Sequence, residues 1–242
     1  CGDCIPGCAV ATLGGDGDPL ADSGLMDGLA PLPDGSLHLS TESLSYSFVW
    51  IANSDEGSVS KLDAQTGAEV GRYASVLPTD GVDARPVDER CNYEDRGNCP
   101  SRTAVDLNGD VFVANRAFGH QGTVTKIAGD VRRCRDRNGD GVISTSQDVS
   151  GDGRIDRDNP EEFLGGDDEC LLFTVPVGDI DGLPRGLAIC EGYYGSGGTV
   201  WVGNYNDHLA TAIDNNDGHI LSQVAELSIS PYGAVCDNRG VL

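Results

Sequence analysis

A short segment of alternating apolar and polar residues occurs three times along the chain. Its copies are Val49-Trp50-Ile51-Ala52-Asn53, Val111-Phe112-Val113-Ala114-Asn115 and Val200-Trp201-Val202-Gly203-Asn204. Each copy is followed by a turn and a second alternating segment, at 57–63, 122–127 and 210–214. Alternation with a period of two is typical of half-buried β-strands.

Other short segments complete each copy. A last strand is predicted at 69–73, 170–175 and 219–227, and a preceding strand at 101–106, 184–190 and 230–236. Four antiparallel strands joined by turns form the blade of a β-propeller. The sequence therefore predicts an all-β fold, a β-propeller of four-stranded blades with about three blades and the start of a fourth.

The repeat is unevenly spaced. The interval from Phe112 to Trp201 is clearly longer than the interval from Trp50 to Phe112. Insertions at about 80–100 and at 134–170 account for the excess, and the second should decorate the edge of a blade. We expect a cysteine- and glycine-rich N-terminal extension over 1–45, ending in a strand near 37–40, and propeller blades over 46–242.

The second insertion contains a twofold calcium-loop pattern. Asp136 begins D-x-N-x-D-G-x-I, and Asp148 begins the second copy, D-x-S-x-D-G-x-I. Oxygen side chains at positions 1, 3 and 5 wrap a hard cation, and glycine at position 6 permits the sharp turn. The predicted ligands, including the position-7 carbonyls, are Asp136, Asn138, Asp140, Val142, Ser144, Asp148, Ser150, Asp152, Arg154, Asp156 and Asn159.

The twelfth position departs from the EF-hand rule, which requires a bidentate glutamate. Gln147 and Asn159 stand there instead. Asp148 is able to close the first loop, and Asp158, Glu161 or Glu162 the second. The paired loops resemble the tandem calcium loops of dockerins and thrombospondin type 3 repeats. The competing interpretation is a solvated acidic loop with glycine turns.

The segments VWIAN and GSVSKLDAQTGAEV resemble propellers of the virginiamycin B lyase and NHL-repeat type. The resemblance covers residues 46–242 with gaps and specifies the fold better than the function. It implies, for a lyase, a histidine and glutamates around Mg²⁺. His120, His208 and Glu191 lie near the aromatic strands, but they do not match that catalytic motif residue by residue.

The charge and the cysteines limit the environment of the protein. A net charge of −23 repels nucleic acid and anionic membranes and attracts divalent cations. Nine cysteines indicate an oxidising compartment. The expected disulfides are Cys91–Cys99, Cys134–Cys170, Cys190–Cys236 and Cys4–Cys8. Cys1 is either the acylated first residue of a bacterial lipoprotein or an arbitrary start, and no apolar segment is long enough to span a membrane.

Two functions remain open from the sequence. The first is a calcium-stabilised extracellular or cell-surface module, in the bacterial envelope, that binds a protein partner or further copies of itself. The alternative is a metal-dependent lyase or lactonase-like hydrolase whose site lies at the propeller axis, near Asn53, Asn115 and Asn204. Three and a fraction blades do not close a ring, so we expect a fragment of a longer protein or completion by other chains.

Overall fold

The computed structural model describes residues 29–31, 37–39, 47–78, 99–190 and 198–236. The chain divides into two compact units, Cys1–Tyr46 and Ser47–Leu242. In the first unit, β1 (Leu29–Pro31) pairs with β2 (Leu37–Leu39). A strand is therefore present where the sequence predicts one near 37–40, but it belongs to a separate hairpin.

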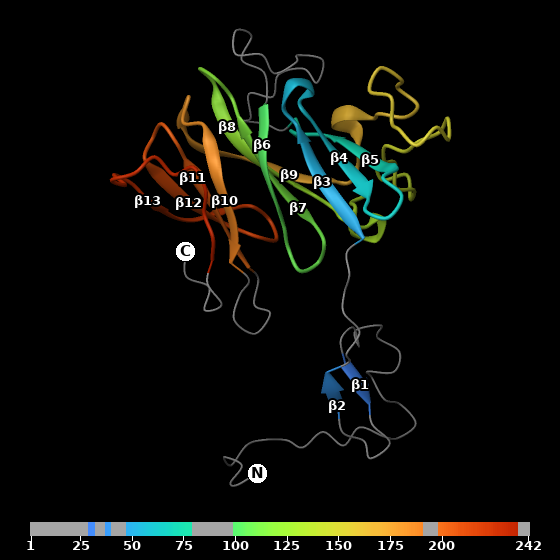
Figure 1. Ribbon diagram of the computed structural model, residues 1–242, viewed down its shortest axis with the longest axis horizontal. Coiled ribbons are helices and arrows are strands. Elements are labelled where there is room, and N and C mark those ends of the chain that lie inside the picture. Colours follow the sequence, from blue (N-terminus) through green and yellow to red (C-terminus); the bar gives the residue numbers. More distant parts are fainter. Residues whose placement is uncertain (1–28, 32–36, 40–46, 79–98, 191–197, 237–242) are drawn as a thin grey trace. The chain divides into compact units, whose positions relative to one another are not determined.

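The described residues of the second unit form three antiparallel sheets that lie side by side (Figure 1). Within each sheet the strand order follows the chain, which is the meander of a propeller blade. The first sheet contains β3 (Phe48–Asn53), β4 (Ser58–Asp63) and β5 (Glu69–Ala74). The second contains β6 (Cys99–Val105), β7 (Val111–Arg116), β8 (Gln121–Ile127) and β9 (Leu171–Ile180). The third contains β10 (Pro184–Cys190), β11 (Thr199–Asn204), β12 (Leu209–Asp214) and β13 (Ile220–Val224).

Helical structure is scarce in the described part of the chain. It consists of the short 3₁₀ turns η1 (Ser54–Glu56), η2 (Val131–Arg133) and η3 (Gly165–Asp167). No helix among the described residues is long and apolar enough to cross a bilayer. The prediction of an all-β propeller fold is confirmed.

The three repeats share one strand register. The asparagine at or next to the end of β3, β7 and β11 lies opposite a residue near the start of the next strand: Asn53 faces Ser58, Asn115 faces Thr123 and Asn204 faces Leu209. Cross-strand partners in an antiparallel pair lie on the same face of the sheet. Positions that are equivalent in the sequence repeat are therefore equivalent in space.

The core consists of two apolar clusters between neighbouring sheets. In the first cluster, Val59 and Tyr73 from the first sheet pack with Val111 and Val113 from the second, and Trp50 packs against them. The second cluster joins the second and third sheets through Phe112, Val124, Phe173, Val177, Val200, Val202 and Ile213. The aromatic residues of β3 and β7 thus both pack at the interface with the following sheet.

The two lysines of the chain link neighbouring sheets at equivalent places. Lys61 Nζ donates to the carbonyl of Gly129 at 2.5 Å, and Lys126 Nζ donates to the carbonyl of Asn215 at 3.0 Å. Lys126 also lies 3.3 Å from a carboxylate oxygen of each of Asp106 and Asp110, which are buried. The third repeat has Ala212 at this position, so it carries no such link.

Three predicted strands differ from the structure. β9 runs to Ile180, where it pairs with Gln121, and so is longer than the predicted 170–175. β13 is shorter than the predicted 219–227. Residues 230–236 form no ladder with the described residues, because a strand requires a partner and the segment stands beside the third sheet without one.

Two predicted disulfides are present, Cys134–Cys170 and Cys190–Cys236. Cys99 is also disulfide-bonded, but its predicted partner Cys91 lies outside the described residues, as do Cys1, Cys4, Cys8 and the insertion around 80–98. Two disulfides are consistent with the oxidising compartment that the cysteine count predicts.

Candidate calcium-binding loops

The first loop is wrapped around the carboxylate of Asp136. Asp136 Oδ1 accepts a hydrogen bond from Gly139 N at 2.6 Å, and its Oδ2 accepts one from Gly141 N at 2.9 Å. Asp140 Oδ1 accepts from Val142 N at 2.8 Å. Gly139 and Gly141 have φ of +76° and +83°, in the left-handed region that favours glycine. The sequence pattern therefore folds as a compact turn with its oxygen side chains directed at its own backbone.

The second loop, which begins at Asp148, repeats this geometry. Asp148 Oδ1 accepts from Gly151 N at 2.6 Å and its Oδ2 from Gly153 N at 2.8 Å. These bonds stabilise the charged carboxylate, and the one from Gly153 has the largest effect in lowering the pKa of Asp148. Asp152 Oδ1 accepts from Arg154 N at 2.9 Å, as Asp140 does from Val142. Two copies with the same hydrogen bonds favour a specific loop structure over a solvated acidic turn.

A buried glutamate from outside the loop pattern closes the first loop. Glu169 Oε1 accepts from Asn138 N at 3.1 Å and from Arg137 N at 2.8 Å, while Oε2 accepts from Ser144 N at 2.8 Å. Its carboxylate thus joins positions 3 and 9 of the loop. These bonds, chiefly the one from Ser144, lower the pKa of Glu169.

Glu162 does the same for the second loop. Its Oε1 accepts from Ser150 N at 3.0 Å and its Oε2 from Asp156 N at 2.8 Å, again positions 3 and 9. Glu162 was one of the sequence candidates for closing this loop, but Glu169 was missed. Glu169 follows the whole second loop in the chain, beyond any local spacing rule, and the adjacent Cys170 that pairs with Cys134 is the only signal of its proximity.

The side chain of Asn159 and the backbone of Gln147, at the twelfth positions, make hydrogen bonds within the insertion. Asn159 Oδ1 accepts from Glu161 N at 3.0 Å, and Gln147 N donates to the carbonyl of Glu162 at 3.1 Å. The carbonyl oxygen of Ser144 accepts from Glu169 N at 2.9 Å. Asn159 stays a predicted ligand of the second loop, and Glu162 is the residue whose carboxylate bonds to the loop backbone.

The oxygen sets fit a hard cation. Each loop contains carboxylate, amide or hydroxyl side chains and is bonded by one buried glutamate, and these donor types suit calcium rather than zinc. The aspartate carboxylates at the start of the loops accept hydrogen bonds from backbone N–H groups. Among the described residues, the group of three acidic or histidine side chains whose ligand atoms all lie within 4.8 Å of one another is Asp214, Asp217 and His219.

That group belongs to the turn between β12 and β13 and is satisfied by the turn itself. Asp217 Oδ1 lies 2.6 Å from His219 Nδ1, and Asp214 Oδ1 accepts from Asn216 N at 2.7 Å. The hydrogen bond with Asp217 raises the pKa of His219. Both Asp217 and His219 are exposed. The hydrogen bonds of the turn therefore account for the close approach of these side chains without a bound ligand.

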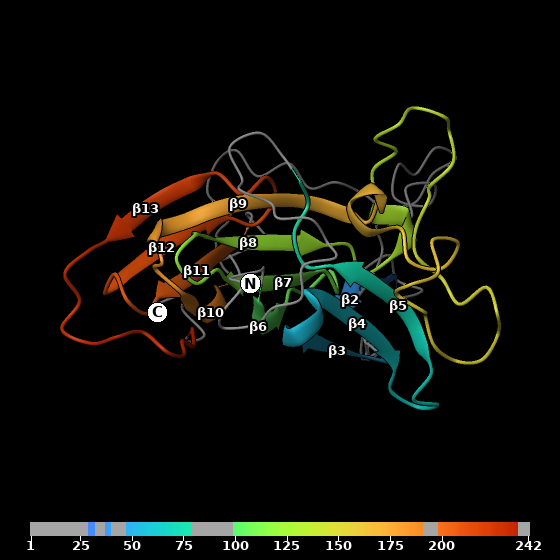
Figure 2. The same cartoon turned by 90° about the horizontal axis from the view of Figure 1, so that it is seen from above.

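From the sequence we expected the insertion only to decorate the edge of a blade. In the structure it also contributes to the core. Ile155, at position 8 of the second loop, is fully buried in the cluster between the first and second sheets. Its N–H donates to Glu69 Oε2 at 2.9 Å, and its carbonyl accepts from Arg72 at 2.8 Å. The insertion leaves the second sheet and packs on β5 of the first, as the yellow loops beside β5 show (Figure 2). The second loop is therefore part of the interface between two sheets.

The residues proposed for an axial enzyme site have other partners. Asn115 Nδ2 donates to the carbonyl of Ser75 at 2.7 Å, and Asn53 Nδ2 donates to Ser60 Oγ at 2.7 Å. Asn204 Nδ2 lies 3.3 Å from Asp207 Oδ2. His208 Nδ1 lies 3.0 Å from the carbonyl of Ile229, and Glu191 is outside the described residues. The amide nitrogens of the three asparagines are therefore hydrogen-bonded, whereas the buried Oδ1 atoms of Asn115 and Asn204 have no hydrogen-bond partner.

Comparison with known proteins adds little about function. No family model and no curated protein matches the chain. Among solved structures, hydrazine synthase of Kuenenia stuttgartiensis matches with a TM-score of 0.35 and 11% identity over 88% of this chain and 65% of that chain. The PQQ-bound aldose sugar dehydrogenase of Streptomyces coelicolor matches with a TM-score of 0.22 and 14% identity over 88% and 74%. This chain thus spans less than two thirds of the length of the hydrazine synthase chain, and the fold assignment rests on the sheets and their register.

Proposed function

We propose that the protein is a calcium-stabilised β-propeller module of the extracellular space or the bacterial cell surface, which works by binding or assembling with protein partners. The observation that carries the proposal is the repeated loop geometry. Two loops with the same aspartate and glycine hydrogen bonds are each spanned by a buried glutamate. In this proposal calcium stabilises the fold and is not a regulator.

The electrostatics of the insertion supports a structural role for the metal. Residues 136–162 carry eight acidic and three basic side chains, a net charge of −5 (3 − 8). A bound divalent cation offsets the repulsion between these carboxylates. Extracellular calcium modules bind at about 10⁻⁴–10⁻³ M, which suits a compartment where calcium is plentiful.

The experiment is limited proteolysis of the whole protein in calcium and in EDTA. Calcium should protect the peptide bonds between Cys134 and Cys170, and EDTA should expose them, so that reducing gels show two fragments. Asp140→Ala and Asp152→Ala should mimic EDTA, whereas Asp55→Ala, an exposed aspartate outside the loops, should not. Unchanged cleavage in EDTA would show that the loops are ordinary acidic turns.

The alternative is a metal-dependent lyase or lactonase-like hydrolase. It requires oxygen or imidazole ligands that converge on the axis. The buried Oδ1 atoms of Asn115 and Asn204 have no hydrogen-bond partner, but among the described residues no group of three acidic or histidine side chains stands with them. The module is therefore the better-supported proposal.

A further inference from the structure

Two arginines from neighbouring innermost strands contact the ring of the same tyrosine. Cζ of Arg102 in β6 lies 4.9 Å from the ring centroid of Tyr232, and Cζ of Arg185 in β10 lies 5.0 Å from it. Tyr205, which follows β11, lies 5.6 Å from Arg185, and its ring meets that of Tyr232 edge to face at 6.1 Å. The hydrogen bond that Arg102 donates, and then the charge of Arg185, lower the pKa of Tyr232. We call these four residues the arginine–tyrosine cluster.

A β-bulge lies at the same place in β6 and β10. The register of β6 shifts after Pro100, and that of β10 shifts after Pro184. A bulge leaves one residue out of the ladder and changes the direction of its side chain. In β10 this residue is Arg185, and Tyr232 likewise follows a proline in the segment 230–236. The cluster is therefore built by a feature of the repeat.

The cluster faces the axis of the propeller. β6 and β10 lie side by side, and Ser101 Oγ donates to the carbonyl of Pro184 at 3.3 Å. The segment 230–236, which the repeat places as the next innermost strand, is joined to β10 by the disulfide Cys190–Cys236. Innermost strands surround the central channel, so side chains from strands that are not neighbours meet only on the axial side. Arg102 and Tyr232 are such a pair.

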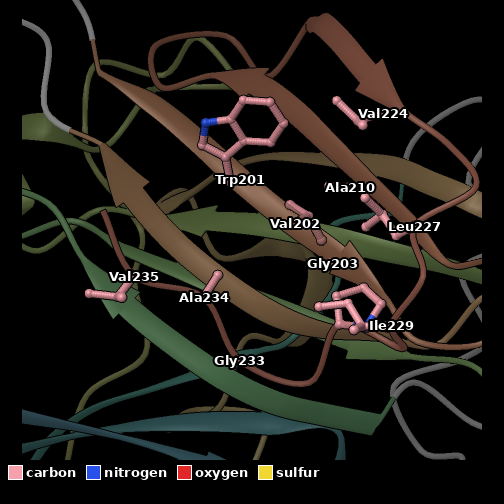
Figure 3. A pocket seen from close by; sticks show the side chains of 11 residues that line it. Trp201, Val202, Gly203, Ala210, Val224, Leu227, Ile229, Gly233, Ala234 and Val235 are labelled. Carbon is pink, nitrogen blue, oxygen red and sulfur yellow. The ribbon is translucent and has the colours of Figure 1, made fainter. Parts of the chain in front are cut away.

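An open apolar groove on the third sheet is a separate surface. It has a volume of about 890 Å³ (Figure 3). Its lining includes Trp201, Val224, Pro231, Gly233, Ala234 and Val235. Tyr232, in the middle of this segment, does not line the groove. The ring of Tyr232 is therefore directed away from the groove, and the uncovered face of the third sheet takes no part in the cluster.

The positive charge of the cluster is not balanced by a neighbouring carboxylate. In the described part of the chain, no aspartate or glutamate forms an ion pair with Arg102 or Arg185. Arg102 Nη1 donates to the carbonyl of Ser101 at 3.1 Å, and the buried Nε of Arg185 has no hydrogen-bond partner. Both arginines are partly buried, and a buried charge is costly unless it is paired. A ligand with negative charge would remove this cost.

We propose that the arginine–tyrosine cluster binds an oxyanion, the carboxylate or phosphate group of a ligand that enters the axial channel. Guanidinium groups donate paired hydrogen bonds that match two oxygens of either group. The hydroxyl of Tyr232 supplies a further donor. The site is independent of the calcium loops and goes beyond the structural role of calcium proposed above.

The test is an NMR titration of the arginine Nε–H resonances in the whole protein. Acetate is the carboxylate probe and methyl phosphate the phosphate probe, each exchanged for chloride at constant ionic strength and in calcium. The Nε–H resonances of Arg102 and Arg185 should shift to saturation with at least one probe. The probe with the higher affinity identifies the group that the site prefers. Arg132 Nε donates to Asp130 at 2.9 Å, and its resonance is the internal control that should not shift.

Variants show whether the two arginines form one site. Arg102→Gln removes one charge and should weaken the binding reported by Arg185 about tenfold, whereas Arg132→Gln should leave it unchanged. Tyr232→Phe removes one hydroxyl and should weaken binding less. The thermal midpoint in chloride checks that each variant folds, and the titration of the unmodified chain needs no variant.

Absence of a saturable shift with both probes overturns the oxyanion site. Undiminished affinity in Arg102→Gln overturns the sharing of one ligand by two arginines. Protection of the calcium loops from proteolysis would stand in either case, so the two proposals fail separately.

Discussion

The carboxylates of Glu162 and Glu169 make equivalent hydrogen bonds in two consecutive loops. Each joins the third and ninth backbone amides of its loop. Glu162 follows its own loop closely, whereas Glu169 is separated from the first loop by the entire second one. The closing glutamate thus lies at a different sequence distance from each loop. Its position is set by the fold and not by local spacing in the sequence.

Replacement of Glu169 by glutamine should destabilise the first loop. Glutamine offers one acceptor oxygen where the carboxylate offers two, and its amide group would face a backbone N–H that is left without an acceptor. The denaturant midpoint measured in EDTA should fall, and calcium affinity should fall as well. Glu162→Gln should behave alike, and the exposed Glu161→Gln is the control. Equal stability of all three variants would contradict the closing role.

The two loops should differ in what they support. Asp152→Ala should lower the thermal midpoint of the whole protein more than Asp140→Ala, because the second loop holds Ile155 in the core between two sheets. The difference should disappear in EDTA, where neither loop holds metal. Thermal unfolding followed by circular dichroism checks both statements, and a larger effect from Asp140→Ala would contradict them.

The buried ion group around Lys126 should be costly to break. Lys126→Met leaves the carboxylates of Asp106 and Asp110 without their shared cation, although Arg133 still pairs with Asp110 at 2.6 Å. The expected loss is about 3–5 kcal/mol. Arg132→Met removes a surface pair with Asp130 and should cost no more than about 1 kcal/mol. Guanidinium titration distinguishes the two, and similar losses would refute the argument.

The equivalent aromatic positions should differ in their contribution to the isolated chain. Phe112→Ala opens a cavity in a filled interface and should cost about 3–5 kcal/mol. Trp201→Ala, at the open groove, should cost far less in dilute protein. Guanidinium denaturation of dilute protein provides the measurement, and equal costs for the two variants would contradict the difference.

His219 should titrate above the usual histidine range. Its hydrogen bond with Asp217 favours the charged ring and raises its pKa. A raised pKa in the folded state stabilises the fold below the unfolded value, and this contribution is lost as pH rises through the folded value. Asp217→Asn should return the pKa towards 6.5. NMR titration of the ring protons gives the answer directly, and an unchanged pKa in the variant would contradict the pairing.

The sequence predicts local features well and distant partners poorly. Alternation around Trp50, Phe112 and Trp201 locates three aromatic strands close to their observed ends, because a strand pattern is local. The disulfide between Cys134 and Cys170 is also predicted, since the two cysteines bracket one insertion.

What the sequence does not predict depends on packing between segments. Ile155 is the expected apolar residue at position 8 of a calcium loop, but nothing in its neighbourhood indicates that it fills the core beside Val59. Glu169 likewise reaches its loop only through the return of the chain to β9. Residues 230–236 have a strand pattern without a ladder, because the pattern does not supply a partner.

The position of Ile155 has a consequence for the order of folding. The amide of Ile155 bonds to Glu69, 86 residues earlier, and Leu77 N bonds to Thr174, 97 residues later. Contacts of such long sequence separation form slowly, because the intervening chain must first be ordered. We therefore expect the first sheet to complete its core only after the insertion has folded. Calcium should accordingly accelerate refolding as well as stabilise the folded protein. A chain that folds where calcium is scarce would leave the packing of its first sheet incomplete.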